Sequence, residues 1–274
     1  MSVYEEKALT PVQTIDGLNF KRDDLYAPFG KGVNGGKLRQ CMMLLASIKN
    51  THKAVITYCS IHSPQAPITA ASARACGLEC CVLYGGTTPS AINSLPMPRL
   101  AEKYGARIKI AARSGRHAVL HAKAKKLAAE DCFIVQYGIN LSAHGDVLLG
   151  AVAAQVENIP DVENLVLTCG SGITAAGVFI GLNQYHKNVK NVHLVATAPD
   201  RQAFIHGLLK DADRQFFYHD LYGSPGFVYE KGVQCSWGGL KLHPHYEAKT
   251  MQWFKGSGID PARTLFWIVG AEPR

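Results

Sequence analysis

Short apolar runs alternate with helical stretches through most of the chain. The apolar runs predict buried strands at residues 53–60, 79–86, 107–112, 132–138, 163–170 and 191–199. Amphipathic or alanine-rich stretches predict helices at residues 63–77, 96–106, 117–130, 144–158 and 173–186. Strands that are apolar on both faces and alternate with helices are typical of a parallel sheet covered on both sides. The pattern therefore predicts an α/β protein.

The regular order is lost between about residues 211 and 244, where glycine, proline and aromatic residues accumulate. We interpret this stretch as an irregular segment over a site. No internal repeat or low-complexity tract interrupts the rest.

The amino-acid composition excludes some classes of protein and favours certain partners. Of the 274 residues, 47% are hydrophobic and 18% are charged, which excludes a charge-rich disordered protein or a long coiled coil. The net charge of +8 favours anionic partners such as phosphates, carboxylates or nucleic acid. The basic helix around residues 113–126 could bind nucleic acid, or it could simply be a solvated surface.

The cysteines indicate a reducing compartment. No two of them have the spacing of a CxxC motif, and most have apolar neighbours, so we expect buried thiols. The N-terminus lacks the apolar core of a secretory signal, and no run approaches the ~18 apolar residues of a membrane span. We expect a cytoplasmic protein without a membrane segment.

Residues 167–179, LTCGSGITAAGVF, predict a site for a phosphate group. A strand ends at Gly170-Ser171-Gly172 and a helix begins near Ile173 or Thr174, so backbone N–H groups and two hydroxyls can converge on an anion. The stretch is neither a P-loop nor GxGxxG, and an ordinary strand-to-helix turn is the alternative. We call residues 170–174 the phosphate loop.

Two further residues stand at predicted helix starts. Lys37 follows a glycine-rich turn, and a lysine beside apolar residues at a helix N-terminus can be neutral and form a Schiff base. Ser63 is expected to cap a helix whose free N–H groups could hold a carboxylate. A surface lysine and a purely structural cap are the alternatives.

These features occur in the order found in one enzyme family. KRDDL (21–25), NGGKLRQCMMLL (34–45), the segment 56–78, QYGIN (136–140), LHPHYEAKTMQWF (242–254) and TLFWIVG (264–270) resemble successive motifs of that family. The chain resembles the 1-aminocyclopropane-1-carboxylate deaminase / D-cysteine desulfhydrase family, which belongs to the fold-type-II pyridoxal-phosphate enzymes related to the tryptophan synthase β subunit. The likeness extends over most of residues 20–270.

The resemblance implies a role for each matching residue. Lys37 would hold pyridoxal 5'-phosphate as an aldimine, and Ser63 and Tyr246 would be catalytic. The phosphate loop, Gly170, Ser171, Gly172, Ile173 and Thr174, would bind the cofactor phosphate. Glu247 would face the pyridine nitrogen and keep it protonated, which makes a quinonoid carbanion accessible.

The resemblance also implies an architecture. The expected arrangement is a two-domain fold with the cofactor between a large domain (1–40 and 140–274) and a smaller inserted α/β domain (41–139). A homodimer is implied by the family alone.

The chain departs from the family pattern around the substrate. Gly36 and Pro64 replace asparagines, Gln65 replaces a histidine, and Ile173 replaces a small residue. A second active-site tyrosine is expected in the shortened 205–245 region, where Tyr222 and Tyr229 are candidates. The pair His243 and His245 has no third ligand nearby, so we expect no metal site.

Three functions remain open at this point. The leading hypothesis is a lyase or deaminase that acts at Cα or Cβ of a small amino acid. The second is a decarboxylase or lyase whose amino-acid substrate is carried on a nucleotide or on DNA, as the positive charge and the changed serine segment suggest. The third is a pyridoxal-phosphate-binding protein without catalysis, since Gly36 and Pro64 would orient the cofactor less well.

Overall fold

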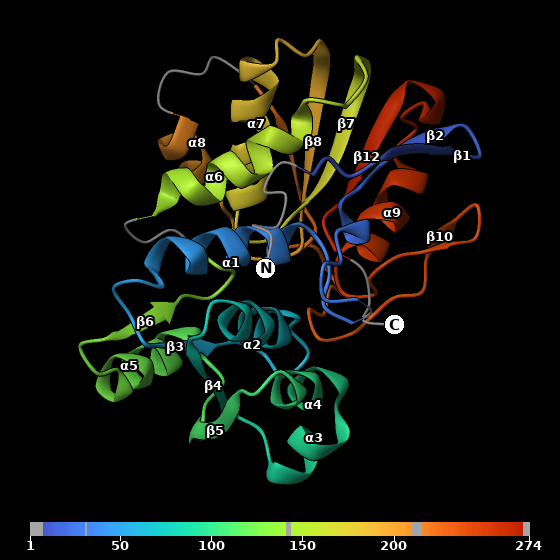
Figure 1. Ribbon diagram of the computed structural model, residues 1–274. Helices are drawn as coiled ribbons and strands as arrows, with labels where there is room; N and C mark the ends of the chain where they lie inside the picture. Colours follow the sequence, from blue (N-terminus) through green and yellow to red (C-terminus); the bar gives the residue numbers. More distant parts are fainter. Residues whose placement is uncertain (1–7, 31, 141–143, 210–214, 271–274) are drawn as a thin grey trace. The chain divides into compact units, whose positions relative to one another are not determined.

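The chain folds into two compact units. The structure is a computed structural model that describes residues 8–30, 32–140, 144–209 and 215–270. Unit 1 comprises residues 1–28 and 148–274, and unit 2 comprises residues 29–147 (Figure 1). The sequence placed these boundaries at 40/41 and 139/140. The helix that contains Lys37, Gly36–Ile48, lies wholly in unit 2. It is grouped there because it packs against the next helix of that unit.

Unit 2 is built around a four-stranded parallel sheet of order β5-β4-β3-β6. Its strands are β3 (Ala54–Tyr58), β4 (Glu79–Gly85), β5 (Arg107–Ala112) and β6 (Cys132–Val135). Its helices are α1 (Gly36–Ile48), α2 (Gln65–Ala75), α3 (Pro89–Ser94), α4 (Pro96–Lys103) and α5 (His117–Leu127). All the strands predicted here are present, which confirms the α/β pattern.

The two faces of this sheet are covered by different helices. Ile56 and Leu83 pack with Leu120 and Ala124 of α5. The intervening Thr57 faces the other way, where its hydroxyl accepts a hydrogen bond from Gln65 of α2. Alternate residues of a strand point to opposite faces, so α2 and α5 lie on opposite sides of the sheet.

Unit 1 is built around a six-stranded sheet of order β1-β2-β12-β7-β8-β9, parallel except for the β1–β2 hairpin. Its strands are β1 (Val12–Ile15), β2 (Leu18–Arg22), β7 (Val162–Cys169), β8 (Val189–Ala196), β9 (Phe217–Asp220) and β12 (Thr264–Ile268), with a separate hairpin β10 (Ser236–Trp237) and β11 (Leu240–Lys241). Its helices are α7 (Ile173–Gln184), α8 (Gln202–Leu209) and α9 (Glu247–Gly256), while α6 (Gly145–Ala153) spans the boundary. Short 3₁₀ turns are η1 (Asp23–Leu25), η2 (Ala154–Val156) and η3 (Pro261–Arg263).

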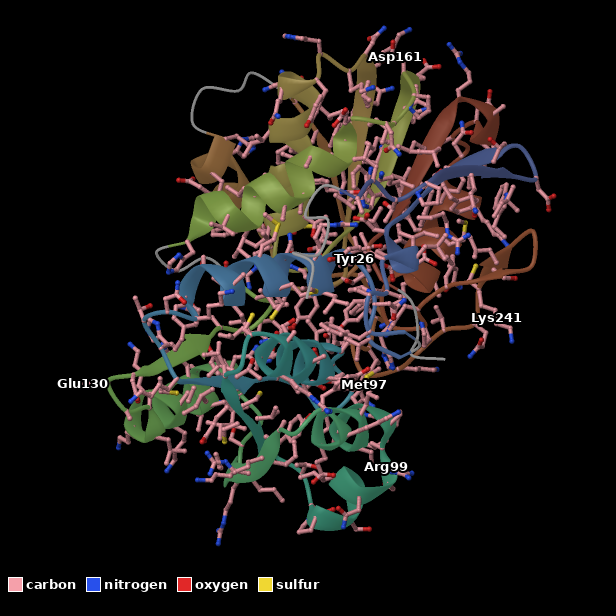
Figure 2. All side chains as sticks on the ribbon, in the orientation of Figure 1. Tyr26, Met97, Arg99, Glu130, Asp161 and Lys241 are labelled. Atoms are coloured by element: carbon pink, nitrogen blue, oxygen red, sulfur yellow. The ribbon has the colours of Figure 1, made fainter. Side chains whose placement is uncertain are left out.

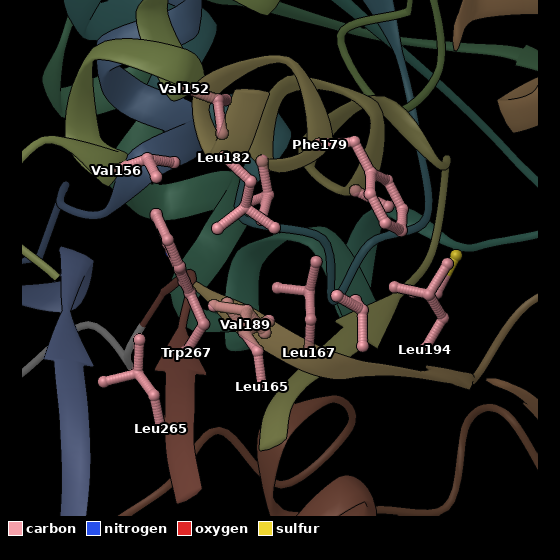
Figure 3. Packing of buried hydrophobic residues seen from close by; sticks show 14 of the residues in the cluster. Val152, Val156, Leu165, Leu167, Phe179, Leu182, Val189, Leu194, Leu265 and Trp267 are labelled. Carbon is pink, nitrogen blue, oxygen red and sulfur yellow. The ribbon is translucent and has the colours of Figure 1, made fainter. Parts of the chain in front are cut away.

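The core of unit 1 has one layer on each face of its sheet. Leu167 and Trp267 pack with Phe179 of α7 in the layer drawn in Figure 3. Val166 and Phe266 belong to the opposite layer, with Met251 of α9. Adjacent residues of β7 and β12 therefore serve two different layers, which explains why these strands are apolar without interruption.

The KRDDL motif supports this sheet with buried polar contacts. Lys21 donates to the carbonyl of Thr10 at 2.7 Å, and Asp23 accepts hydrogen bonds from the Thr10 hydroxyl and the Trp267 indole. The Arg22 guanidinium forms a two-bonded pair with Asp24. Buried charges need such partners, so this motif has a structural role in the fold.

The expectation of buried thiols holds for half of the cysteines, and the other four are partly exposed. All eight cysteines are free thiols, and Cys41, Cys59, Cys80 and Cys169 are buried. Within the described ranges, every helix is too short or too polar to cross a membrane.

Two glycines let α7 approach α6 and η2 closely. A Cβ at Gly177 would lie 2.6 Å from the Cβ of Val152, and a Cβ at Gly181 would lie 2.6 Å from the carbonyl oxygen of Ala153. Such distances are shorter than any real carbon contact, so the spacing of these helices requires glycine.

We therefore expect Gly181→Ala to destabilise the protein by about 1–3 kcal/mol, because α7 must move away from η2. The matched control is Gly150→Ala in α6, where an added Cβ has no atom within 4 Å. That substitution should raise stability by up to about 1 kcal/mol, since alanine favours a helix. Chemical denaturation measures both changes, and equal effects would contradict the close approach.

Candidate functional site

The phosphate loop lies at the switch point of the unit 1 sheet. From β7 the chain moves outward through β8 and β9, and β12 returns to the other side of β7. Ligands of open α/β sheets bind where the strand order reverses, at the carboxyl ends of the strands. Residues 170–174 directly follow β7 at this position, and the backbone beyond β12 lies beside them in the sheet order.

The backbone of the phosphate loop requires glycine at one position. Gly172 has φ of 86°, and a Cβ there would lie 3.1 Å from atoms of both Phe204 and Ile205. It is the N-cap residue of α7, and a glycine has no side chain with which to cap the first turn of that helix. The N-terminus of α7 therefore presents N–H groups and a positive dipole end, which suit an anion.

Glu247 is held by the backbone that follows β12. Its Oε1 accepts hydrogen bonds from the N–H groups of Val269 at 3.1 Å and Gly270 at 3.2 Å. Its Oε2 is buried and has no partner among the described residues. Burial raises the pKa of Glu247 to about 7, against the lowering effect of these N–H donors. The carboxyl group thus has one oxygen fixed and one available to a donor.

Tyr246, which precedes Glu247, contacts a second tyrosine. The hydroxyls of Tyr246 and Tyr229 are 2.8 Å apart. Lys249 donates to the carbonyl of Tyr229 at 3.0 Å and so fixes its backbone. Of the two candidates for the second tyrosine, the structure brings Tyr229 to Tyr246, whereas Tyr222 is exposed.

Lys37 lies at the switch point of the unit 2 sheet. Here β3 leads outward to β4 and β5, and β6 returns to the other side of β3. Lys37 is the second residue of α1, and its Nζ donates to the carbonyl of Gly138, just beyond β6, at 2.9 Å. Its amine is therefore held at the carboxyl ends of β3 and β6, and the side chain is partly buried.

Gln65 links the segments that follow β3 and β6. Its amide nitrogen donates to the Thr57 hydroxyl at 2.8 Å and to the Gln136 carbonyl at 2.9 Å. Its amide oxygen accepts from the N–H of Gly138 at 2.7 Å. Gln65, which stands where the family has a histidine, therefore positions Gly138, whose carbonyl accepts the hydrogen bond from Lys37.

The start of α2 differs from the expectation for Ser63. Pro64 occupies the N-cap position, and the Ser63 hydroxyl accepts from the N–H of Gln65 at 3.3 Å. Burial raises the pKa of the neighbouring Cys59 thiol to about 12, against the lowering effect of the Ala66 N–H. Pro64 and Pro67 have no N–H. Of the four first N–H positions of this helix, two are prolines and a third, that of Gln65, donates to Ser63, so this helix start offers a carboxylate fewer donors than the sequence expectation.

One buried hydroxyl near the phosphate loop was not found from the sequence. Thr197 follows β8, and its N–H bonds to the carbonyl of Cys169 at 3.1 Å. Its hydroxyl is buried without a partner among the described residues. Thr197 lies inside the stretch 191–199 that the sequence predicts as a strand, and no sequence signal separated it from the strand. His243 and His245 belong to no cluster of three or more metal-binding side chains in the described part of the chain.

Comparison with known proteins identifies the family. Residues 6–220 match the family model described as "Pyridoxal-phosphate dependent enzyme". The chain belongs to this family. It is 27% identical over 336 aligned positions to the "O-seryl-dTMP PLP-dependent decarboxylase" of Salmonella phage ViI, covering 93% of this chain and 78% of that protein.

Solved structures place the fold among fold-type-II enzymes. A homologue of 1-aminocyclopropane-1-carboxylate deaminase superposes with a TM-score of 0.75 at 18% identity, covering 96% of this chain and 89% of that one. A fungal L-serine ammonia-lyase from Rhizomucor miehei superposes with a TM-score of 0.65 at 12% identity, covering 96% and 93%. The cofactor of the family is pyridoxal phosphate.

The residues present fit that cofactor. The free Oε2 of Glu247 lacks a donor, and a protonated pyridine nitrogen is one. The N-terminus of α7, which begins after Gly172, suits a phosphate, and Lys37 supplies a partly buried amine. These features concern the chain itself and do not depend on the comparisons.

The buried carboxyl group predicts a pH dependence. Its pKa is about 7 in the folded protein and about 4.3 in an unfolded chain. A raised pKa contributes stability at low pH that is lost as the pH rises through 7. In cofactor-free protein, Glu247→Gln should gain about 2–3 kcal/mol of stability relative to wild type between pH 5 and pH 8.

Denaturation at both pH values measures this difference. The exposed Glu102 provides the control, since Glu102→Gln should follow the wild type at each pH. A constant offset between Glu247→Gln and wild type would show that the carboxyl group is not buried in this way.

The tyrosine contact predicts unequal effects of two similar substitutions. Tyr229→Phe removes the hydroxyl that touches Tyr246, so turnover by the reconstituted enzyme should fall by about 100-fold, a usual loss for a proton-transfer group. Tyr222→Phe changes an exposed ring and should leave the rate unchanged. Steady-state kinetics separate kcat from KM, and equal rates for the two variants would exclude Tyr229 from the site.

Proposed function

We propose that this enzyme is a decarboxylase for an amino acid that is carried on a nucleotide. The observation that carries the proposal is the buried Glu247 carboxyl group with one oxygen free, because it can hold the proton of the cofactor ring. When bound, pyridoxal phosphate supplies a sink for the electron pair released at Cα, and it does so best with that nitrogen protonated.

The choice of decarboxylation is supported by the relative from phage ViI. Its similarity extends along 93% of this chain, and its name describes a serine linked to dTMP and the loss of a carboxyl group. In that reaction the bond from Cα to the carboxylate breaks, carbon dioxide leaves, and the electron pair at Cα takes up a proton.

The start of α2 agrees with this choice. A helix N-terminus with free N–H groups would hold the carboxylate firmly in the ground state, and such binding lowers the rate of a reaction that expels it. Here Pro64 and Pro67 remove two donors, and the Ser63 hydroxyl accepts the N–H of Gln65. The weakened carboxylate site favours loss of carbon dioxide over its retention.

The side chains then have separate tasks. Lys37 is the amine that would hold the cofactor, and it can deliver the proton to Cα from its position against the Gly138 carbonyl. The phosphate loop would bind the cofactor phosphate, and Glu247 would bind its ring nitrogen. Tyr246 and Tyr229 can share a proton through their 2.8 Å contact.

That tyrosine contact also supports a second candidate, a lyase or deaminase for a free small amino acid. A paired tyrosine and Ser63 match residues to which the family resemblance assigns catalysis of such a reaction. The two candidates predict different products, carbon dioxide against ammonia and a keto acid.

The test compares substrates on enzyme reconstituted with pyridoxal phosphate. Serine linked to dTMP should release carbon dioxide without ammonia, and free serine, cysteine and 1-aminocyclopropane-1-carboxylate should not react. Lys37→Ala should lose the visible absorbance of the bound cofactor and at least about 10³-fold in rate. Lys49→Ala at the other end of α1 is the matched control and should behave as wild type.

Ammonia from a free amino acid, without carbon dioxide, would favour the second candidate and overturn decarboxylation. Protein that takes up no cofactor would overturn both.

A further inference from the structure

The positive charge of this chain is concentrated in one segment. Residues 107–127 contain seven lysines and arginines and no acidic residue, and we call them the basic segment. The rest of the chain contains 22 Lys and Arg against 21 Asp and Glu, so the basic segment accounts for nearly all of the net charge of +8. Its cations are all exposed: Arg107, Lys109, Arg113, Arg116, Lys123, Lys125 and Lys126.

The fold of unit 2 places these cations on one surface. The basic segment consists of the edge strand β5, a short loop and α5. Because α5 packs on the sheet through Leu120 and Ala124, its lysines project away from the core. Arg107 and Lys109 of β5 line the same 230 Å³ cavity as Leu127 at the end of α5, so strand and helix border one hollow. Figure 2 shows nitrogen-tipped side chains extending outward from this part of unit 2.

Little on the protein neutralises this charge. Arg107 pairs with Glu79, and none of the other six cations forms an ion pair with a residue that the structure describes. Protein surfaces usually intersperse charges of both signs. Glu79 and Asp131 line the cavity beside Arg107 and Lys109, and the remaining excess of cations attracts an extended anion.

The spacing of the cations indicates the kind of anion. From Arg116 to Lys126 the helix rises about 15 Å, at 1.5 Å per residue. A DNA duplex carries one charge per ~1.7 Å, or about nine over that length. A membrane-binding helix would insert a broad apolar face, whereas Leu120 and Ala124 of α5 are buried against Ile56 and Leu83. Of the large apolar side chains of α5, only Val119 and Leu127 are exposed.

We propose that the basic segment binds the phosphate backbone of a nucleic acid. The inference rests on the proposed function, and it specifies the substrate further: the nucleotide that carries the amino acid is part of a polynucleotide. The basic segment would bind phosphates on both sides of the modified nucleotide without reading its base, since lysine contacts to phosphate carry no sequence information.

The test measures binding of the holoenzyme to a fluorescein-labelled DNA duplex by anisotropy over a range of salt concentrations. The variant Lys123→Gln/Lys125→Gln/Lys126→Gln removes three charges and keeps side-chain length and helix propensity. Each lost phosphate contact should reduce the slope of log affinity against log salt by about 0.9, and affinity near 0.1 M salt should fall at least about tenfold.

The matched control is Lys103→Gln/Lys190→Gln/Lys241→Gln, which removes the same charge from exposed positions outside the basic segment. It should bind as wild type does. Cofactor absorbance and circular dichroism of each variant establish that it is folded.

Equal losses in the two variants, or no DNA binding by wild type at low salt, would overturn the proposal. Stronger binding to phosphatidylserine vesicles than to DNA would overturn it as well. Turnover of serine-linked dTMP without any DNA binding would reject the basic segment and leave the proposed function intact. Salt-dependent DNA binding without decarboxylation would reject the proposed function alone.

Discussion

The candidate site depends on a buried carboxyl group of which only one oxygen accepts hydrogen bonds from the described residues. Glu247 is buried, with Oε1 bound by two backbone N–H groups and Oε2 without a partner. An unpaired buried acceptor costs free energy, and a ligand that brings a donor recovers it. The backbone beyond β12 creates this situation, because the chain must pass the start of α9 at hydrogen-bond distance. The chemistry that we propose needs the proton which this oxygen can hold.

Both units place their reactive groups by the same rule. In the parallel part of each sheet the chain moves outward from one strand, β7 or β3, and a later strand, β12 or β6, pairs with the other side of that strand. The segments that follow these two neighbouring strands diverge at their carboxyl ends. In unit 1 those segments are the phosphate loop and the backbone that holds Glu247. In unit 2 they are the stretch with Ser63 and the carbonyl of Gly138, which holds Lys37. Rigid strands thus fix groups that are far apart in the sequence.

The proposed reaction depends on single hydrogen bonds, whereas the proposed substrate depends on the summed charge of a surface. In the proposed function, the prolines at the start of α2 and the acceptor Ser63 would act on single hydrogen bonds and leave a carboxylate weakly held. The basic segment acts through summed charge over a much longer distance. Under these two proposals, single hydrogen bonds at α2 would influence which bond breaks, while the summed charge of the basic segment would select a polymeric substrate.

The sequence by itself determined the layered fold and the phosphate loop. Strand and helix periodicity is local, and a strand followed by Gly170-Ser171-Gly172 limits what the backbone can do. The resemblance to the family added Lys37 and Glu247. The choice of Tyr229 over Tyr222, the grouping of α1 with unit 2 and the use of Gln65 as a structural link were decided only by the tertiary structure. The same holds for the occupied N–H of Gln65 at the start of α2 and for the free oxygen of Glu247. Each of these depends on which distant atoms share a hydrogen bond, and residue order along a single chain does not contain that information.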